Sequence, residues 1–467
     1  LGPRGKPRSG PASQPGLAPA VLRRIFFSPF AMLIFIRLGR VFCLGVSGAL
    51  VAAEPAALSL EQALASVEKV SLTVLLSRET QLQALEAANQ QRAGNLPTLT
   101  ATAQQRRSQG VSIATVVVTS GRPANRFDAL LSGNYALWDP DLRATLQAAR
   151  MGVQVAQANY AAAVQAVMAE VAANYFVNLR NLRRLDVIEA NIARARALLE
   201  LARNQLAAGV ATQIDVTRAE AQLAVAEQAR LQQDTTVHQS QLLLKRLLDI
   251  EPGRPLRLEG FELKRGSPAL YTFSEEKTAF ERRAEYLAAQ RAVEQSRLTV
   301  RAASHERLPS LSLNGNVGLA SPQWDDSDKQ EQWAFGVGLS VPVFDGLRTS
   351  ANRRLALSRQ RAQETRLHHL ELQISSELRL AVQDAGSRNA QVTVAEKGLR
   401  LAEEELRLAR QRYQQGVADN REVVEAQNRL AMAEDNLVDA VHQYNLSRVE
   451  LARVRGDVRT VLAEKGP

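Results

Sequence analysis

The chain has 467 residues, of which 5% are aromatic, and a formal net charge of +10. This length can bury a core, but few aromatic residues and abundant alanine favour closely packed helices over a thick globular centre. The basic balance would suit a nucleic-acid-binding protein, yet residues 1–53 contain seven of the 58 basic residues and no acid, so 51 basic residues face 48 acidic ones in the remainder and no nucleic-acid partner is expected.

Residues 1–53 have the pattern of an export signal. Residues 1–20 are rich in proline and glycine and are expected to be unstructured. Arg23–Arg24 then precedes two apolar runs, and small residues allow cleavage after Ala53. Because neither run reaches the roughly 18 residues of a spanning helix, a signal peptide is favoured over a retained membrane anchor.

The only cysteine, Cys43, lies in this segment. A mature chain without cysteine has no disulfide, no thiol chemistry and no cysteine-bound zinc, which is compatible with the periplasm. The residues before Cys43 do not form a lipoprotein box, so we expect no lipid anchor.

A first helix is predicted to open at Leu60 and to end before Pro97, because proline cannot continue a helix. After Pro97 the spacing of apolar residues falls from 3.5 to 2. Residues 126–138, and the segments between 311 and 341, alternate apolar with small or polar residues over about ten positions, which is the length that a tilted strand needs to cross a bilayer.

A half-buried hairpin on a soluble core would show the same alternation. The long helices on either side leave no such core, so we favour hairpins that cross a membrane. The residues expected to face lipid are Phe127, Leu131, Tyr135, Leu313, Val317, Trp333, Phe335, Val337 and Leu339.

The stretch from Asp141 to Glu251 contains no proline and only two glycines, one of which is Gly209. Between Val164 and Leu206 apolar or small residues recur every 3.5 positions, which is the spacing of a coiled-coil seam. We predict two long helices that meet at Gly209, the first about 100 Å long at about 1.5 Å per residue.

The second half of the chain repeats this order. Gly209-Val210 is matched by Gly416-Val417, 207 positions later, and Leu96-Pro97 is matched by Leu308-Pro309. We therefore predict a mostly α-helical chain with transmembrane β-strands, built from two copies of one unit. The expected segments are a helix at 54–95, a β-hairpin at 96–138, a helical hairpin at 139–250 with its tip at 209–216, a linker or collar at 251–275, a helix at 276–307, a β-hairpin at 308–344 and a helical hairpin at 345–467 with its tip at 416–425.

Four strands cannot close a membrane barrel, and their open edges would leave unpaired amides in lipid. Several copies of the chain must therefore combine. Two copies would give eight strands around a filled interior, whereas three would give twelve strands around a lumen.

No catalytic, cofactor or metal site is expected. The five histidines form no pair at a metal-binding spacing on a helix, and no phosphate-binding glycine loop occurs. The adjacent His368 and His369 fit a solvated position on a helix better than a ligand pair. We therefore expect a protein that is not an enzyme.

Acidic residues follow both predicted turns. Asp215 follows Gly209 and Glu422 follows Gly416, with Glu425 one turn further along the same helix. In a three-fold assembly each position would form a ring of three carboxylates that attracts cations. Acids in the first turn of a helix also stabilise the helix dipole, and the spacing does not choose between these roles.

Together these features resemble the TolC family of outer-membrane efflux and secretion channels. The resemblance extends from Leu58 to Leu462 and rests on the ordered pair of copies, the Leu-Pro-x-Leu strand starts, the Phe-Asp-Gly-Leu-Arg junction at Phe344–Arg348 and both Gly-Val turns. It implies a homotrimer in the outer membrane, in which a twelve-stranded barrel continues into a periplasmic barrel of twelve helices that the helical hairpins close at the far end.

The resemblance also implies roles near the turns. Glu422 and Glu425 match the constricting acidic ring of the family, where aspartate is typical. Asp215 and Tyr413 match a latch between the two hairpins.

The hairpin tips are implied to meet a periplasmic adaptor protein. An arginine that ties the hairpins together in some members falls on Ala418, so the latch is expected to be weaker here or to use Arg421. The tip residues are Gly209, Val210, Ala211, Gly416, Val417 and Ala418.

The resemblance implies a passive duct that receives its substrate from an inner-membrane ABC transporter or an RND pump. Because no lipid anchor is expected, type I secretion of a protein is favoured, as by the components that release adenylate cyclase-haemolysin toxins. Multidrug efflux through an RND pump is the alternative. A soluble periplasmic coiled-coil scaffold is the alternative from another class.

Overall fold

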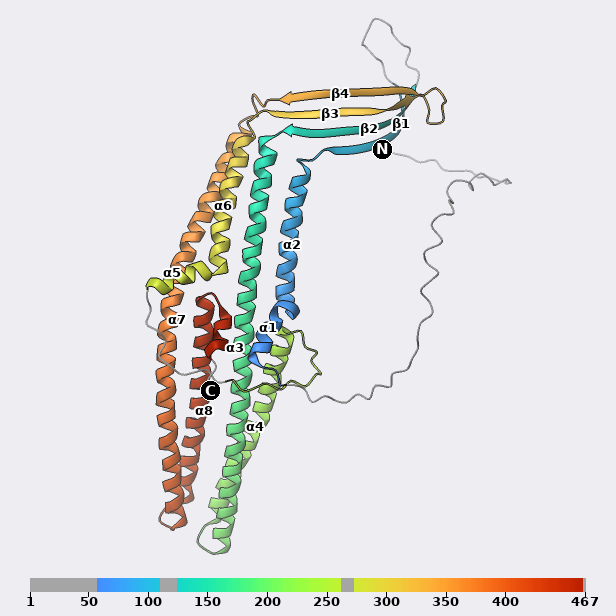
Figure 1. The fold of residues 1–467 in the computed structure, drawn as a ribbon. Coiled ribbons are helices and arrows are strands. Elements are labelled where there is room, and N and C mark those ends of the chain that lie inside the picture. The colour runs from blue at the N-terminus through green and yellow to red at the C-terminus, as the bar shows by residue number, and fades with distance from the viewer. Residues whose placement is uncertain (1–56, 110–123, 262–272, 465–467) are drawn as a thin grey trace, which may run out of the picture. The chain divides into compact units, whose positions relative to one another are not determined.

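The structure is a computed structural model that describes residues 57–109, 124–261 and 273–464. All of them belong to the unit Pro55–Pro467, and the export signal predicted for residues 1–53 lies outside the described residues. The elements in chain order are α1 (Leu60–Val70), α2 (Leu72–Ala93), β1 (Thr98–Ser108), β2 (Ala124–Trp138), α3 (Pro140–Ala207), α4 (Gln213–Leu247), α5 (Phe273–Arg282), α6 (Ala284–His305), β3 (Ser310–Ser321), β4 (Gln330–Ser340), α7 (Arg348–Gln414), α8 (Asn420–Val454) and the short 3₁₀-helix η1 (Val458–Glu464) (Figure 1).

Matching elements in the two halves confirm the prediction of two copies. Helices α3 and α7 have 68 and 67 residues, α4 and α8 both have 35, and α2 and α6 both have 22. At about 1.5 Å per residue, α3 and α7 are each about 100 Å long. The α3–α4 and α7–α8 turns lie at one end of this unit and the strands at the other (Figure 1).

Two helices that the sequence predicted as continuous are each broken at one residue. The segment 54–95 is divided at Ser71 and the segment 276–307 at Arg283, with ψ angles of 120° and 113° that lie outside the helical region. The break allows α1 to bury its apolar face in a core shared with α3. Apolar spacing did not reveal the breaks, because it continues on both sides of each one.

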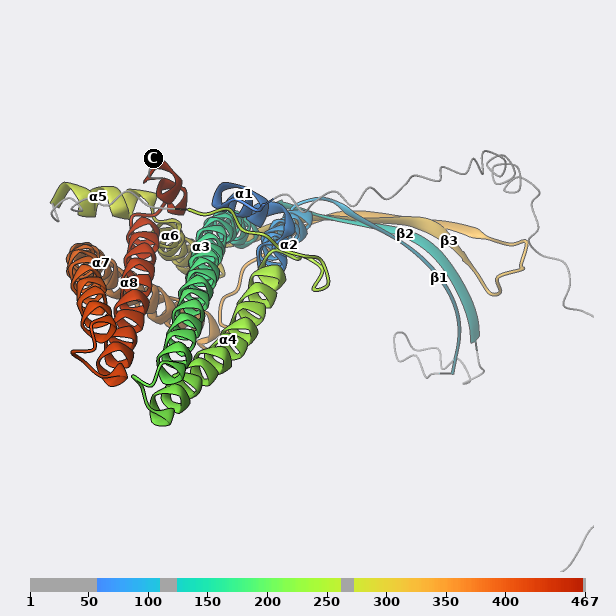
Figure 2. The ribbon, with the colours of Figure 1, turned by 90° about the horizontal axis from the view of Figure 1, so that it is seen from below.

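Helix α3 is the centre of the helical layer. It contacts α2, α4, α6 and α8, whereas α7 contacts α6 and α8. None of the predicted seam residues between Val164 and Leu206 is exposed. Viewed from below, the long helices follow the order α7, α8, α3, α4, which leaves α7 on one flank and α4 on the other (Figure 2).

The described part of the predicted linker, residues 251–261, is fastened to the middle of α3. Leu58 and Leu258 form a parallel β-bridge. The hydroxyl oxygen of Tyr175 lies 2.9 Å from the carbonyl oxygen of Leu58 and 2.6 Å from that of Glu259. Residues 262–272 of the predicted linker lie outside the described ranges.

The four strands form one antiparallel sheet in the order β1–β2–β3–β4. Pairing of β2 with β3 joins the two predicted hairpins, so the two repeats share a single sheet. Among the described strands, β1 and β4 each have one neighbour, and each therefore presents an edge.

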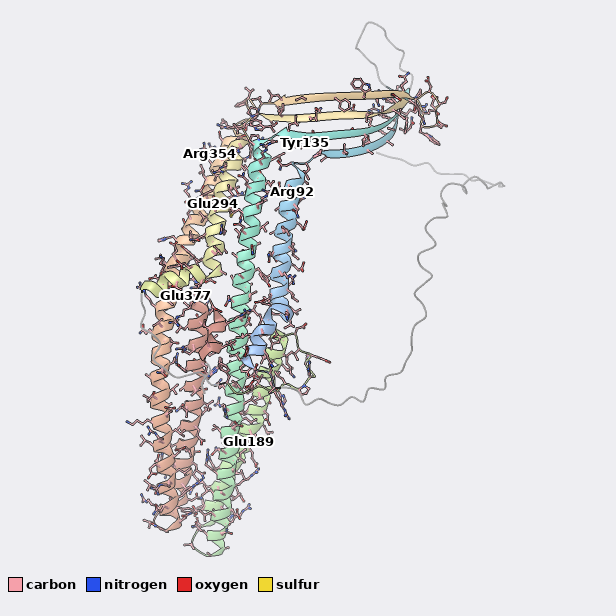
Figure 3. The ribbon with its side chains drawn as sticks, in the orientation of Figure 1. Arg92, Tyr135, Glu189, Glu294, Arg354 and Glu377 are labelled. Carbon is pink, nitrogen blue, oxygen red and sulfur yellow. The ribbon has the colours of Figure 1, made fainter. Side chains whose placement is uncertain are left out.

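Charged side chains cover the outside of the helices, as Glu189, Glu294 and Arg354 illustrate (Figure 3). None of the helices in the described ranges is sufficiently long and apolar to cross a membrane.

Candidate functional site

Both helical hairpins turn in the same way. Helices α3 and α7 are each followed by a glycine with a φ of +72°, Gly209 and Gly416. The N–H of the valine after each glycine donates to a carbonyl oxygen in the last helical turn, at 2.9 Å in the first hairpin and 3.0 Å in the second. This is the Schellman arrangement, which requires a left-handed residue after the helix and therefore favours glycine.

The residues predicted to meet an adaptor lie at these turns. Val210 and Val417 are 73% and 68% exposed, and a Cβ added to Gly209 or Gly416 would meet no atom within 4 Å. Ala211 and Ala418, by contrast, are half-buried. The first tip therefore offers Val210 and also Ile214, which is 63% exposed, to solvent, and the second tip offers Val417.

Asp215 belongs to the N-terminal cap of α4. Its Oδ2 accepts hydrogen bonds from the Thr212 N–H at 3.0 Å and from the Thr212 hydroxyl at 2.6 Å, and its Oδ1 lies 3.4 Å from Nη1 of Arg218. The bond from the Thr212 hydroxyl is the main cause that lowers the pKa of this carboxyl below its ordinary value of 3.8. The carboxylate is thus engaged within its own hairpin.

Tyr413, the predicted partner of Asp215, is buried in the core near the turns, together with Val216 and Val423. Burial, and next the negative charge of Asp215, raise the pKa of Tyr413. The hydroxyl of Tyr413 has no hydrogen-bond partner within the described part of the chain. The structure therefore brings the predicted latch residues close together without a direct bond between them.

Asn420, which the sequence analysis did not assign, makes a hydrogen bond between the hairpins. It is fully buried, and its Nδ2 donates to the backbone carbonyl oxygen of Asp215 at 3.0 Å. A second hydrogen bond, donated by Gln222 Nε2 to Asn428 Oδ1 at 2.6 Å, lies further along α4 and α8. The sequence held one signal for this contact: Asn420 lies at seam spacing, three positions before Val423. A polar asparagine in an otherwise apolar seam often fixes the register of the two helices.

Both acids predicted for the constriction have an arginine partner. Oε1 of Glu422 lies 3.3 Å from Nη1 of Arg412 on α7, and Oε1 of Glu425 lies 2.8 Å from Nε of Arg421. The two carboxylates reach solvent, with 36% and 47% of their side chains exposed. Local pairing weakens the attraction that unpaired carboxylates would have for cations, and it occupies Arg421, the alternative latch residue, within its own helix.

A ladder of ion pairs joins the hairpins above the tips. All three arginines lie on α3 and all three acids on α8, so the ladder crosses from one repeat to the other. The pairs are Arg180–Asp439 at 2.6 Å, Arg184–Asp435 at 2.8 Å and Arg194–Glu434 at 2.5 Å. These pairs were not foreseen, because similar charges occur along the whole length of both helices.

At the other end of the unit, strand register places the apolar side chains on one face of the sheet. Leu131 pairs with Val317, which also pairs with Trp333, and Tyr135 pairs with Leu313. Direct cross-strand partners share a face, and alternate residues along a strand share it too. The nine residues predicted to face lipid therefore all lie on this face, and seven of them are exposed while Phe127 and Tyr135 are half-buried.

The opposite face of the sheet is polar and, over most of its length, uncharged. A shallow hollow on it is lined by Thr98, Thr100, Ser132, Asn134, Asn314 and Asn316. In the described ranges no group of three or more metal-ligating side chains could hold a metal ion.

Comparison with known proteins gives a family match. The model of the family described as "Outer membrane efflux protein" matches residues 56–249 and 277–457. Outer membrane protein OprJ of Pseudomonas aeruginosa is 28% identical over 310 residues, which are 62% of this chain and 61% of OprJ. The proteases secretion protein PrtF of Dickeya chrysanthemi is 25% identical over 268 residues, which are 56% of this chain and 58% of PrtF.

The fold matches solved structures as well. The CmeC outer membrane channel of Campylobacter jejuni superimposes with a TM-score of 0.73 at 18% identity, over 87% of this chain and 88% of CmeC. This likeness confirms the predicted fold of long helices with a small β-sheet. Because the family model covers most of the chain in the order of the two repeats, the chain belongs to the outer membrane efflux protein family.

Proposed function

We propose that three copies of the chain form a passive export conduit through the outer membrane. The observation that supports this most is the single four-stranded sheet with one apolar face, one polar face that is uncharged over most of its length, and two edges. An edge in lipid would leave N–H and C=O groups without hydrogen bonds. Pairing β4 of one copy with β1 of the next removes every edge, and three copies would enclose a lumen lined by the polar face.

The helical flanks support the same assembly. Leu380, Val394, Leu401 and Leu408 on α7 are 66%, 70%, 63% and 46% exposed, and their spacings are multiples of seven. An apolar stripe of this period is a coiled-coil seam that lacks its partner helix. Val225 and Leu231 are exposed on α4, the opposite flank, so a ring can form by repeating one flank-to-flank contact.

The hairpin turns act as the gate in this proposal. Two hydrogen bonds donated by side-chain amides join α4 to α8, and the ion-pair ladder joins α3 to α8. Together they hold the hairpins in a closed arrangement. Opening requires the hairpins to separate and these bonds to break. Glu422 and Glu425 then line the narrow end, where their pairing with arginine limits cation preference.

An export conduit of this kind works with two partners, one at its tips and one in the inner membrane. A periplasmic adaptor docks on the exposed valines at the tips, and an inner-membrane transporter supplies energy and substrate. In this proposal the conduit itself is passive. Export of a protein is our first proposal, supported by the likeness to PrtF, and efflux of small molecules is the second, supported by the description of the family.

Two variants test the assignment of the sheet faces. Val337→Lys on the apolar face should prevent membrane insertion, since a lysine facing mid-bilayer costs roughly 2–4 kcal/mol. Asn316→Lys on the polar face is the matched control and should insert. The measurements are recovery from the outer membrane fraction and conductance of the purified protein in planar bilayers.

The alternative, a soluble scaffold, makes the opposite prediction. It requires both lysine variants to be recovered without detergent and the parent protein to give no conductance, and that result would overturn the conduit. The cargo is tested separately in a strain that lacks the chain. Loss of an exported protein from the medium supports secretion, whereas unchanged secretion with increased sensitivity to small toxic compounds supports efflux.

A further inference from the structure

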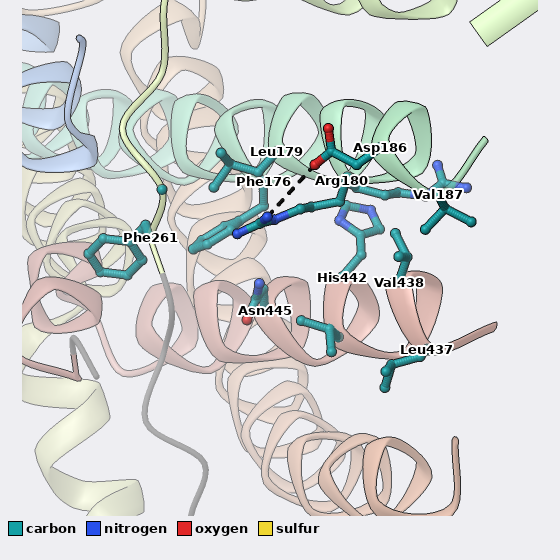
Figure 4. Close-up of a pocket in the computed structure, with 13 residues that line it drawn as sticks. Phe176, Leu179, Arg180, Asp186, Val187, Phe261, Leu437, Val438, His442 and Asn445 are labelled. Atoms are coloured by element: carbon teal, nitrogen blue, oxygen red, sulfur yellow. Dashed lines mark ion pairs between the residues drawn. The ribbon is translucent and has the colours of Figure 1, made fainter. Parts of the chain in front are cut away.

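A pocket of about 380 Å³ lies between α3 and α8, beside the described end of the linker. Phe176 and Leu179 line it from α3, and Leu437 and Val438 line it from α8 (Figure 4). Phe261 of the linker closes one end, where its ring meets that of Phe176 edge-on at a centroid distance of 5.9 Å. The walls are thus mostly carbon.

The size of this pocket suits a small molecule. Protein interiors are closely packed, and an engineered apolar cavity of about 150 Å³ is sufficient to bind benzene. A space more than twice as large can accept a molecule with two fused rings. Apolar walls also make it a poor site for ordered water, which needs several polar partners.

One polar group in the wall has unused hydrogen-bonding capacity. His442 is 6% exposed, and its ring makes a hydrogen bond with the backbone of Phe176. Burial, followed by the nearby charge of Arg180, lowers the pKa of His442, so the ring is neutral at pH 7. Its Nδ1 is buried without a partner within the described part of the chain, and in the neutral ring it is an acceptor.

The remaining polar groups define the ligand further. Asn445 also lines the pocket and carries both an amide donor and an acceptor. Of the arginines at the rim, Arg180 is paired with Asp439 at 2.6 Å and Arg183 with Asp186 at 3.7 Å. A charged ligand would have to compete with these pairs, whereas a neutral hydroxyl can donate to His442 and accept from Asn445.

The pocket lies on the α3–α8 contact that carries the ion-pair ladder, since Arg180 at its rim is paired with Asp439. It lies between two neighbouring helices in the middle of the layer, away from the α7 and α4 flanks and away from the turns. A neighbouring copy that packs on either flank does not need to cover it. The flank contacts and the turns of the proposed conduit therefore assign no role to this pocket.

We propose that this pocket binds a neutral one- or two-ring molecule that carries a hydroxyl group. The hydroxyl hydrogen-bonds with His442 and Asn445, and the rings fill the space between Phe176, Phe261 and Val438. A molecule bound there contacts α3 and α8 together and so stabilises the contact between the two repeats.

The test uses 2-naphthol and its methyl ether, which has the same rings without the hydroxyl hydrogen. Binding to the full-length protein in lipid nanodiscs is followed by naphthol fluorescence and by the rise in melting temperature. We expect one saturable site per copy and a Kd for the ether about tenfold weaker, which corresponds to one hydrogen bond.

Three variants assign the site. Val438→Trp fills the pocket and should abolish binding of both compounds, whereas Met432→Trp, an exposed position on the same helix, should leave both unchanged. His442→Phe should reduce 2-naphthol to the affinity of the ether, and it tests the proposal even where Val438→Trp does not fold. Equal binding of the two compounds to the parent protein, or naphthol binding that is unchanged in His442→Phe, would overturn the proposal.

Discussion

The two hairpin turns share a backbone and differ in side-chain chemistry. Both place a glycine at a φ of +72° and both are followed by an acid. In the first turn the N-cap residue is Thr212, whose N–H and hydroxyl donate to Asp215, whereas in the second turn it is Asp419, which accepts from the Glu422 N–H at 3.3 Å. The following acid thus binds the cap of its own helix in the first turn, as Asp215 does, and pairs with the preceding helix in the second, as Glu422 does with Arg412, although the turns are copies of one unit.

The largest effect is expected from replacing the glycine that both turns share. Gly209→Val and Gly416→Val should each destabilise their turn by about 1–2 kcal/mol, because a side chain is strained in the left-handed region. The space around both positions is open, so strain is the only cost. Hydrogen exchange of the tip peptides measures the effect, and a turn that tolerates valine without faster exchange would contradict the assigned backbone.

Asn420→Ala should have the next largest effect. It removes the buried bond to the Asp215 carbonyl, so the closed arrangement should lose about 1 kcal/mol. We expect several-fold higher conductance of the closed channel in planar bilayers. Asn428→Ala is the control, because it removes the less buried hydrogen bond with Gln222, and it should raise the conductance less. Equal effects of the two variants would mean that Asn420 has no special role.

Asp215→Asn tests the cap of the first turn alone. The folded state lowers the pKa of Asp215, so its ionised form stabilises the turn above the ordinary value of 3.8, and this contribution is lost as the pH falls below that value. We expect a weaker capping box, in which Asp215 accepts from the N-cap residue Thr212, to cost up to about 1 kcal/mol at pH 7 and less at pH 3. Hydrogen exchange of the first tip at both pH values provides the measurement, and an equal loss at both would contradict the capping role.

The smallest effects are expected at the paired acids. Glu422→Gln with Glu425→Gln should leave stability unchanged and lower the cation preference of the channel only modestly, because both carboxylates already face arginines. Arg412→Gln, which releases Glu422, should raise the cation preference. Reversal potentials in a salt gradient measure both changes. A large loss of selectivity in the double variant would show that the arginines do not neutralise the ring.

Sequence reasoning predicted the repeats and the strands well, because long helices and alternating strands impose periods that extend over many residues. The breaks at Ser71 and Arg283 escaped it, since one extended residue hardly alters a period. The region of the proposed gate was only partly predictable. The glycine turns follow from local backbone chemistry, whereas the bond from Asn420 to Asp215 depends on how two hairpins 205 positions apart pack against each other.

Membership of the outer membrane efflux protein family places the chain in the outer membrane, with its helices reaching into the periplasm. The family is one of channels and not of enzymes, in agreement with the lack of a catalytic constellation in the sequence. The chain spans 61% of OprJ and 58% of PrtF, and its cargo and partners are proposals that the experiments above address.

The most direct test of the account is the number of copies in the membrane-extracted protein, measured by native mass spectrometry after release from detergent. The edges of the sheet and the unpartnered stripe on α7 predict that copies associate, and a lumen lined by the polar face requires three of them. A single copy that remains soluble without detergent would contradict the conduit.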